Sequence, residues 1–208
     1  MSHPATLPPC PDPRTGQPRP PRAPLVRDRN PNAPTERGKQ HNAPRPPHEA
    51  SPMVEWFHRS RARSLLARLT LVSVIFVIGV FMGGVDLPRV LVFWVTLGSW
   101  ALISGLRKHN PSLSAGVDWL THENGNFVLT YQLASVEVAG TKPHQSLRLV
   151  DVYGNEFSSD LDDPQRNREL WDLVYNGILH SVHVNGATIS QSARDSLELD
   201  NPLRFRGE

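Results

Sequence analysis

Two apolar runs without a charged side chain, at 69–85 and 90–106, lie four residues apart in the middle of this 208-residue chain. Each run has seventeen residues, and a helix that crosses a bilayer needs about 17 to 25. Apolar residues 65–67 lengthen the first run, because an arginine near a helix end can extend its guanidinium to the headgroups. The sequence therefore predicts a two-helix transmembrane hairpin, with helices at 65–85 and 90–106 and a turn at 86–89. Buried helices of a soluble protein are the alternative, although neither run shows their usual polar face.

Basic residues flank this hairpin, and the turn holds only one of them. The flanking residues are Arg59, Arg61, Arg63, Arg68, Arg107 and Lys108. Because basic residues favour the cytoplasmic side, we expect a multi-pass protein of the cell (inner) membrane with both termini in the cytoplasm. The same side chains are expected to attract anionic lipids. Residues 53–64 are interpreted as an interfacial basic segment, with Trp56 and Phe57 at the headgroups.

Residues 1–52 form a basic tail that holds fifteen of the twenty prolines and has a net charge of +4. So few large apolar residues cannot build a core, and the composition predicts a disordered segment that is partly polyproline II. The stretch 18–24, Pro-Arg-Pro-Pro-Arg-Ala-Pro, contains overlapping PxxP spacings with arginines. Such a stretch can dock in an aromatic-lined groove, and a solvated spacer is the alternative.

Cys10 is the only cysteine, so no intramolecular disulfide can form. A single cysteine without a disulfide partner is consistent with a reducing cytoplasm. The tail lacks the early apolar core of a secretory signal peptide, and we expect the first apolar run to act as an internal targeting signal. The excess of arginine over lysine, nineteen to three, is typical of a GC-rich bacterial genome.

A linker at 107–116 leads to a small α+β domain at 117–200. Residues 127–133 alternate between apolar and less apolar side chains, which is the period of a half-buried strand. Asn124-Gly125 before it is a hairpin turn signal. The pattern predicts an antiparallel meander of about five strands. The expected strands are 117–121, 127–133, 135–139, 146–152 and 156–161.

One or two helices are expected after the strands. Asp163 is a suitable N-cap followed by Pro164, and the first helix should end near Val184. Leu170, Val174, Ile178 and Val182 repeat every four residues and predict a face that covers the sheet. Thr188 can cap a weaker second helix that ends near Leu199. Residues 201–208 are interpreted as a frayed C-terminus.

The domain is acidic, because seven basic and fourteen acidic side chains give residues 117–208 a net charge of −7. This charge disfavours nucleic-acid binding by the domain, and the tail could bind nucleic acid only nonspecifically. A basic tail beside an acidic domain permits contact between them. Solvated charges on both are the alternative.

No residue is assigned to catalysis, to a cofactor or to a metal. His180 and His183 are spaced so that they could share a metal, but no glutamate or thiolate completes a zinc site. We therefore interpret them as surface or edge histidines. The other candidates also lack the surroundings of a nucleophile elbow, a calcium loop or a metal site. They are His122, His144, Ser158, Ser159, Ser181, Asp160, Asp162 and Asp163.

The hairpin, strand meander and end helix are together similar in outline to bacterial membrane proteins that carry a pleckstrin-homology-like domain. The resemblance covers residues 65–184 and is architectural. It implies seven strands where the sequence predicts five, and no functional residue is transferred from it.

The leading hypothesis is a non-enzymatic membrane protein whose anchored acidic domain serves protein–protein interaction or self-assembly at the cytoplasmic face. The alternative is a membrane-bound enzyme or a regulatory ligand-binding domain with a site assembled in the C-terminal fold. A pocket where histidines and carboxylates converge would favour this alternative.

Overall fold

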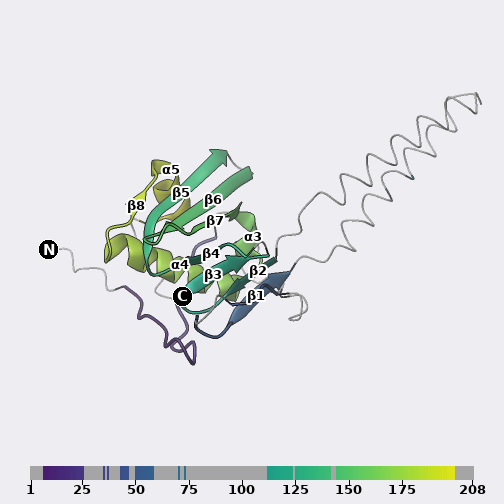
Figure 1. Cartoon of the computed structure of the whole chain (residues 1–208). Coiled ribbons are helices and arrows are strands. Elements are labelled where there is room, and N and C mark those ends of the chain that lie inside the picture. Colours follow the sequence, from purple (N-terminus) through teal and green to yellow (C-terminus); the bar gives the residue numbers. More distant parts are fainter. Residues whose placement is uncertain are drawn as a thin grey trace, which may run out of the picture. The chain divides into compact units, whose positions relative to one another are not determined.

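The computed structural model divides the chain into two compact units, one made of Met1–His58 with Pro111–Glu208 and the other of Arg59–Asn110 (Figure 1). The second unit is described only at Thr70 and Ser73, which are both helical. In all, the structure describes residues 7–25, 35, 37, 43–46, 50–58, 70, 73, 112–123, 125–141 and 144–199.

The predicted transmembrane hairpin is contradicted. In the described part of the chain, no helix has both the length and the apolar character needed to cross a membrane. The longest described helix has 16 residues and carries charged side chains, whereas a span needs about 20 apolar ones. Apart from Thr70 and Ser73, the predicted spans 65–85 and 90–106 lie outside the described residues. The multi-pass inner-membrane location depended on these spans and is contradicted with them.

The described residues instead form an α+β fold with two sheets. The basic residues that flank the runs, where lipid contacts were expected, lie outside the described residues. These are Arg59, Arg61, Arg63, Arg68, Arg107 and Lys108.

The first sheet is an antiparallel meander in the order β1-β2-β3-β4. Its strands are β1 (Glu55–His58), β2 (Ser112–Ala115), β3 (Trp119–His122) and β4 (Phe127–Leu129). The pairing of β3 with β4 confirms the predicted hairpin. Strand β1 pairs with β2 across the whole of residues 59–111, and His58 lies opposite Ser112. The two strands that flank the apolar runs are therefore sheet neighbours.

This pairing corrects two sequence-based assignments. Trp56 and Phe57 were expected at a membrane interface, but they lie in β1, and Phe57 is fully buried. Residues 112–115 were expected in a linker, but they form β2 with all four residues buried. The sequence Ser-Leu-Ser-Ala does not look like a buried strand, because two of its four residues are serines. Since all four residues are buried, burial does not alternate along the strand either.

The second sheet has the order β7-β6-β5-β8. Its strands are β5 (Leu133–Thr141), β6 (His144–Asp151), β7 (Glu156–Asp160) and β8 (Thr188–Ile189). The first three are antiparallel, as predicted, whereas β8 runs parallel to β5. The predicted strand 127–133 is divided, because the chain turns at Thr130–Gln132 and passes from one sheet to the other.

The helix after the strands begins later than predicted. Asp163 lies inside a single turn, α3 (Asp162–Gln165), and Asn167 is the N-cap of α4 (Arg168–His183). The Oδ1 atom of Asn167 accepts hydrogen bonds from the amides of Glu169 and Leu170 at 3.0 and 3.1 Å. An asparagine that bonds these amides satisfies donors which otherwise lack partners at a helix start.

The segment after α4 also differs from the prediction. Thr188 lies in β8 rather than at a helix N-cap, and Ser190 caps the short helix α5 (Gln191–Leu197) through the amide of Ala193. The region after Asp200, predicted to fray, lies outside the described residues.

Helix α4 packs against β5 of one sheet and against β1 and β2 of the other. Its residues Leu170, Val174 and Ile178 are at most 1% exposed, which confirms the predicted apolar face. Seven described strands precede α4, but β1 lies before residues 65–184, so the range of the resemblance to pleckstrin-homology-like domains holds six described strands. The largest fully buried side chains are Trp119, Trp171, Phe57, Phe157, Leu113, Leu120, Leu133, Leu147, Leu149, Leu170, Leu173 and Ile178.

Gly177 lets α4 approach the turn between the sheets. A Cβ atom there would lie 2.6 Å from Thr130 Cβ and 2.9 Å from the Thr130 carbonyl oxygen. Alanine has roughly 1 kcal/mol more helix propensity than glycine, but overpacking typically costs about 1–3 kcal/mol. We expect Gly177→Ala to lower the free energy of unfolding, measured by urea denaturation of the full chain.

Ser192→Ala on the exposed face of α5 is the control, with an expected change within about 0.5 kcal/mol. A Gly177→Ala protein as stable as the wild type would show that α4 and the Thr130 turn are not in close contact.

Candidate functional site

The N-terminal segment, residues 7–25, packs against the α+β core, so the prediction of a disordered tail is wrong for these residues. Ala23 is 2% exposed, and Leu7 and Leu25 are partly buried against the core. The segment contains no helix or strand and makes one turn at 13–15. Most of its anchors lie on one helix, α4.

Three side chains of α4 bond main-chain carbonyls of prolines in this segment. Trp171 Nε1 donates to Pro24 at 2.7 Å, and Asn176 Nδ2 donates to Pro9 at 3.3 Å. His180 Nε2 lies 2.6 Å from the carbonyl oxygen of Pro8, and this nitrogen must carry the proton because a carbonyl can only accept. The order of these contacts means that the segment runs antiparallel to α4.

Asp172 lies beside Trp171 and fixes the end of the segment. Its side chain is 7% exposed, and it accepts the amide of Ala23 and a guanidinium N–H of Arg22, each at 2.9 Å. Arg168 approaches the same carboxylate at 3.7 Å. Burial raises the pKa of Asp172, while the Ala23 amide and both arginines oppose the increase.

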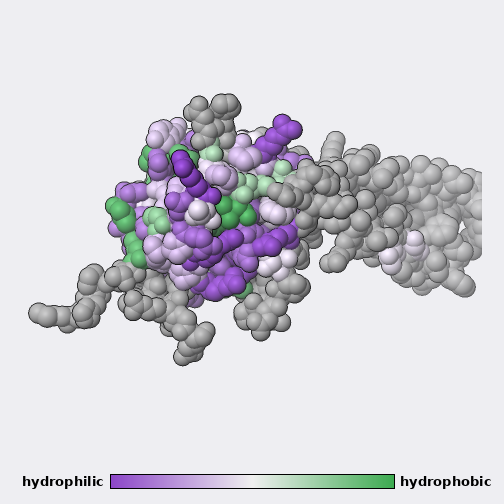
Figure 2. All heavy atoms as spheres, turned by 90° about the horizontal axis from the view of Figure 1, so that it is seen from below, coloured by the Kyte–Doolittle hydropathy of each residue, from purple (hydrophilic) through white to green (hydrophobic). Residues whose placement is uncertain are grey.

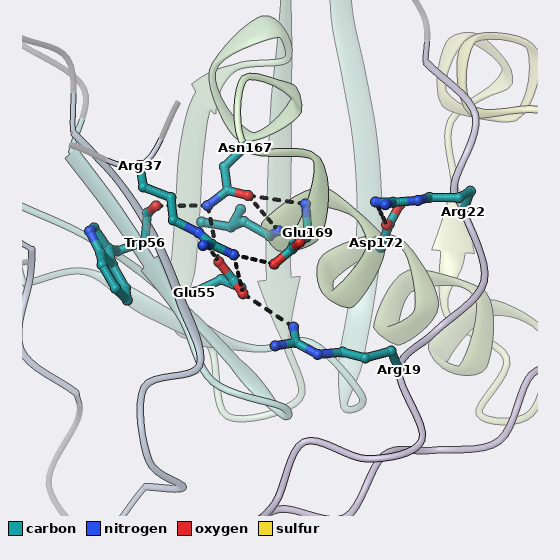
Figure 3. Close-up of polar contacts among 9 residues, drawn as sticks. Arg19, Arg22, Arg37, Glu55, Trp56, Asn167, Glu169 and Asp172 are labelled. Atoms are coloured by element: carbon teal, nitrogen blue, oxygen red, sulfur yellow. Dashed lines mark hydrogen bonds and ion pairs between the residues drawn. The ribbon is translucent and has the colours of Figure 1, made fainter. Parts of the chain in front are cut away.

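A second carboxyl group, Glu55 of β1, lies near the start of α4 (Figure 3). It is 2% exposed and accepts hydrogen bonds from Arg19 at 3.2 Å, from Arg37 at 3.1 and 3.3 Å and from Asn167 at 3.3 Å. Asn167 Nδ2 also donates to the Trp56 carbonyl at 2.7 Å. Three stretches of chain, the N-terminal segment, β1 and α4, therefore meet at Glu55.

Glu55 and Glu169 titrate together. Burial raises the pKa of Glu55, the Glu169 carboxyl raises it further, and Asn167 and Arg37 oppose these effects. A hydrogen bond with Glu55 lowers the pKa of Glu169, which also bonds Arg37. Because the two carboxyl groups interact, their titration belongs to the pair rather than to either residue.

The contact leaves a cavity of about 230 Å³ between the N-terminal segment and the first turns of α4. It is lined by Arg19, Pro20, Arg22, Glu169 and Asp172. The ring of Pro20 therefore borders this cavity. Pro21 and Ala23 instead line a much smaller gap against Tyr175 and Leu179.

The structure does not bring His180 and His183 to one metal. His183 Nε2 lies 2.9 Å from the Leu199 carbonyl, whereas His180 is occupied by the N-terminal segment. Within the described residues, no group of three or more potential ligands could hold a metal ion. Ser181 is a structural residue, because it bonds the Leu133 amide and the Thr130 carbonyl at 3.0 and 2.9 Å.

The remaining candidates are also dispersed. Asp162 and Asp163 pair with Arg166 at 3.0 and 3.6 Å, and the His122 ring lies 6.4 Å from that of Phe157. Asp160, Ser158 and Ser159 lie in β7, and His144 begins β6.

Sequence reasoning missed Glu55, Asn167 and Asp172. One signal was available for Asp172, which is a single acid beside the apolar stripe of α4. Nothing local marks Glu55 as buried, because its partners Arg19 and Asn167 lie 36 and 112 residues away.

The raised pKa of Asp172 predicts the sign of a pH effect. A group that binds its proton more tightly in the folded state contributes most to stability below its unfolded pKa, here 3.8, and this contribution is lost as pH rises through the folded pKa. The wild-type protein should therefore exceed Asp172→Asn in stability by more near pH 4.5 than near pH 7, by roughly 1 kcal/mol per unit of pKa shift.

Urea denaturation of both proteins across this pH range measures the difference. An advantage of the wild type that shrinks on acidification would mean that Arg22 and the Ala23 amide, rather than burial, dominate at Asp172.

No model of a known protein family, no curated protein and no solved structure matches this chain. The resemblance to pleckstrin-homology-like domains, made in architectural outline alone, gains no support from these comparisons.

Proposed function

We propose that the α+β unit is a non-enzymatic protein-interaction module that binds an extended, proline-rich segment along α4. Residues 7–25 are its internal ligand. The observation that carries this proposal is the set of bonds from Trp171, Asn176 and His180 to the carbonyls of Pro24, Pro9 and Pro8.

These donors suit proline chemistry. A polyproline II segment makes no internal hydrogen bonds, so its carbonyls are free to accept them, and proline brings no N–H that needs a partner. Trp171 and Tyr175 lie with ring centroids 5.7 Å apart and form an aromatic pair on the same face of α4. Proline-rich peptides generally dock against aromatic side chains of this kind.

The described surface gives little support to a broad apolar patch as the binding feature. On the face seen in Figure 2, hydrophilic residues predominate and hydrophobic atoms form small separate areas. Among the described residues, the large apolar side chains most exposed are Val152, Tyr153 and Val184. Isolated exposed apolar residues are normal on a protein surface.

The enzyme or small-ligand alternative lacks a favouring observation. Such a site would need histidines and carboxylates close together. His180 and His183 instead each bond a different main-chain carbonyl. The cavity beside Asp172 is lined by arginines, carboxylates and a proline. Its arginines come from the internal ligand, so its shape depends on the bound segment.

Trypsin tests whether the N-terminal segment is docked. The Arg22–Ala23 bond should be cleaved slowly, because Ala23 is 2% exposed and its amide is held by Asp172. Arg14–Thr15 lies in an exposed turn and should be cleaved quickly. Asp172→Ala removes both bonds at 2.9 Å and should speed cleavage after Arg22 by about tenfold or more, since proteolysis follows the population of the open form.

Cleavage after Arg148, which lies within β6, reports global unfolding and should remain slow in both proteins. Equal rates after Arg14 and Arg22 in the wild type would contradict docking of the segment on α4.

A further inference from the structure

The two arginines that the N-terminal segment presents to buried carboxyl groups are three residues apart. Arg19 bonds Glu55 at 3.2 Å, and Arg22 bonds Asp172 at 2.9 Å (Figure 3). A polyproline II helix has three residues per turn and rises about 3.1 Å per residue. Residues three apart therefore lie on one side of such a helix, about 9 Å from each other.

The carboxyl groups that receive these arginines are held by the folded unit itself. Glu55 lies in β1 and also bonds Asn167 and Arg37, and Asp172 lies in the second turn of α4 near Arg168. Each carboxyl group is at most 7% exposed on its side chain. Two carboxyl groups held in fixed positions favour a ligand whose two guanidinium groups have the same separation.

Neighbouring contacts set the register of the ligand. The Ala23 amide donates to Asp172, and the Pro24 carbonyl accepts from Trp171, so the residues after the second arginine are also anchored. Ala23 is 2% exposed, which leaves little room for a larger side chain. In contrast, Pro20 faces the cavity of about 230 Å³, so its side chain is not closely packed.

From this geometry, and resting on the proposed function, we infer that the α4 groove selects proline-rich segments of a partner protein that carry Arg-x-x-Arg-Ala-Pro. Glu55 and Asp172 determine this specificity by binding the two arginines. The internal ligand satisfies the groove of its own chain, so a second copy is not required, and a partner segment competes with residues 18–24.

Labelled peptides and the full chain test this specificity. The matched peptide has the sequence of residues 18–24, and its control carries one additional proline between the arginines, which rotates the second arginine by about a third of a turn. The protein is the Arg19→Ala/Arg22→Ala double variant, in which the internal ligand is weakened while Glu55, Asp172 and Trp171 are kept. Fluorescence anisotropy measures the dissociation constants.

We expect the matched peptide to bind roughly tenfold or more tightly than the control, and the preference to fall below about threefold when Asp172→Asn is added to the double variant. The asparagine oxygen can still accept the Ala23 amide, so this change tests the charge at Asp172. The wild-type protein should bind the matched peptide more weakly than the double variant does, because its own segment competes.

The outcomes separate the two proposals. Equal binding of both peptides would overturn the specificity and leave the proposed function standing. No binding of either peptide to the double variant would overturn both. Sedimentation of the wild-type chain should show a monomer, and a dimer that the double variant loses would identify a second copy as the occupant and overturn the inferred partner.

Discussion

Asn167 joins the parts of this unit, because one side chain both starts α4 and ties it to the first sheet. Its oxygen caps the helix at the amides of Glu169 and Leu170, and its nitrogen donates to Trp56 and Glu55 of β1. The cap fixes where α4 begins, and α4 in turn places Trp171 and Asp172. Since a helix start without its cap loses about 1 kcal/mol, Asn167 stabilises both the fold and the groove.

The charges of the chain have a structural explanation in this arrangement. The overall charge of +2 conceals a tail of +4 and a C-terminal domain of −7. Arginines of the tail meet acids of the folded unit at Arg19–Glu55, Arg22–Asp172 and Arg37–Glu169. Exposed ion pairs contribute little to stability, but here each carboxyl partner except Glu169 is almost fully buried. Such pairs are better suited to selecting a partner than to holding a fold together.

Local sequence patterns predicted the elements that depend on residues close together in the sequence. The β3–β4 hairpin, the strands β5 to β7 and the apolar face of α4 follow from alternation, turn residues and a four-residue repeat. The same patterns failed where tertiary contacts decide the outcome. Alternation continued through Thr130–Gln132 although the chain changes sheets there. Thr188 suited a helix cap, but it pairs with Ser135 of β5.

The site was less accessible from the sequence than the fold. The stretch 18–24 was identified as a potential groove ligand, and contact between the tail and the domain was considered. The groove itself could not be found, because Ala23 and Asp172 are 149 residues apart. Because a transmembrane hairpin was inferred from the apolar runs, the residues of β1 were assigned to the membrane interface and those of β2 to a linker. The structure pairs these strands with each other, because Phe57 and Leu113 complete a core formed mainly by residues after 112.

Docking of the N-terminal segment on α4 can be measured directly through Cys10. This sole cysteine is exposed, and its sulfur lies 3.6 Å from His180 Nδ1. A nitroxide on Cys10 should strongly attenuate the amide NMR signals of the last turns of α4 around His180. Attenuation there no greater than at the amide of Thr141, at the far end of the β5–β6 hairpin, would contradict the docked arrangement.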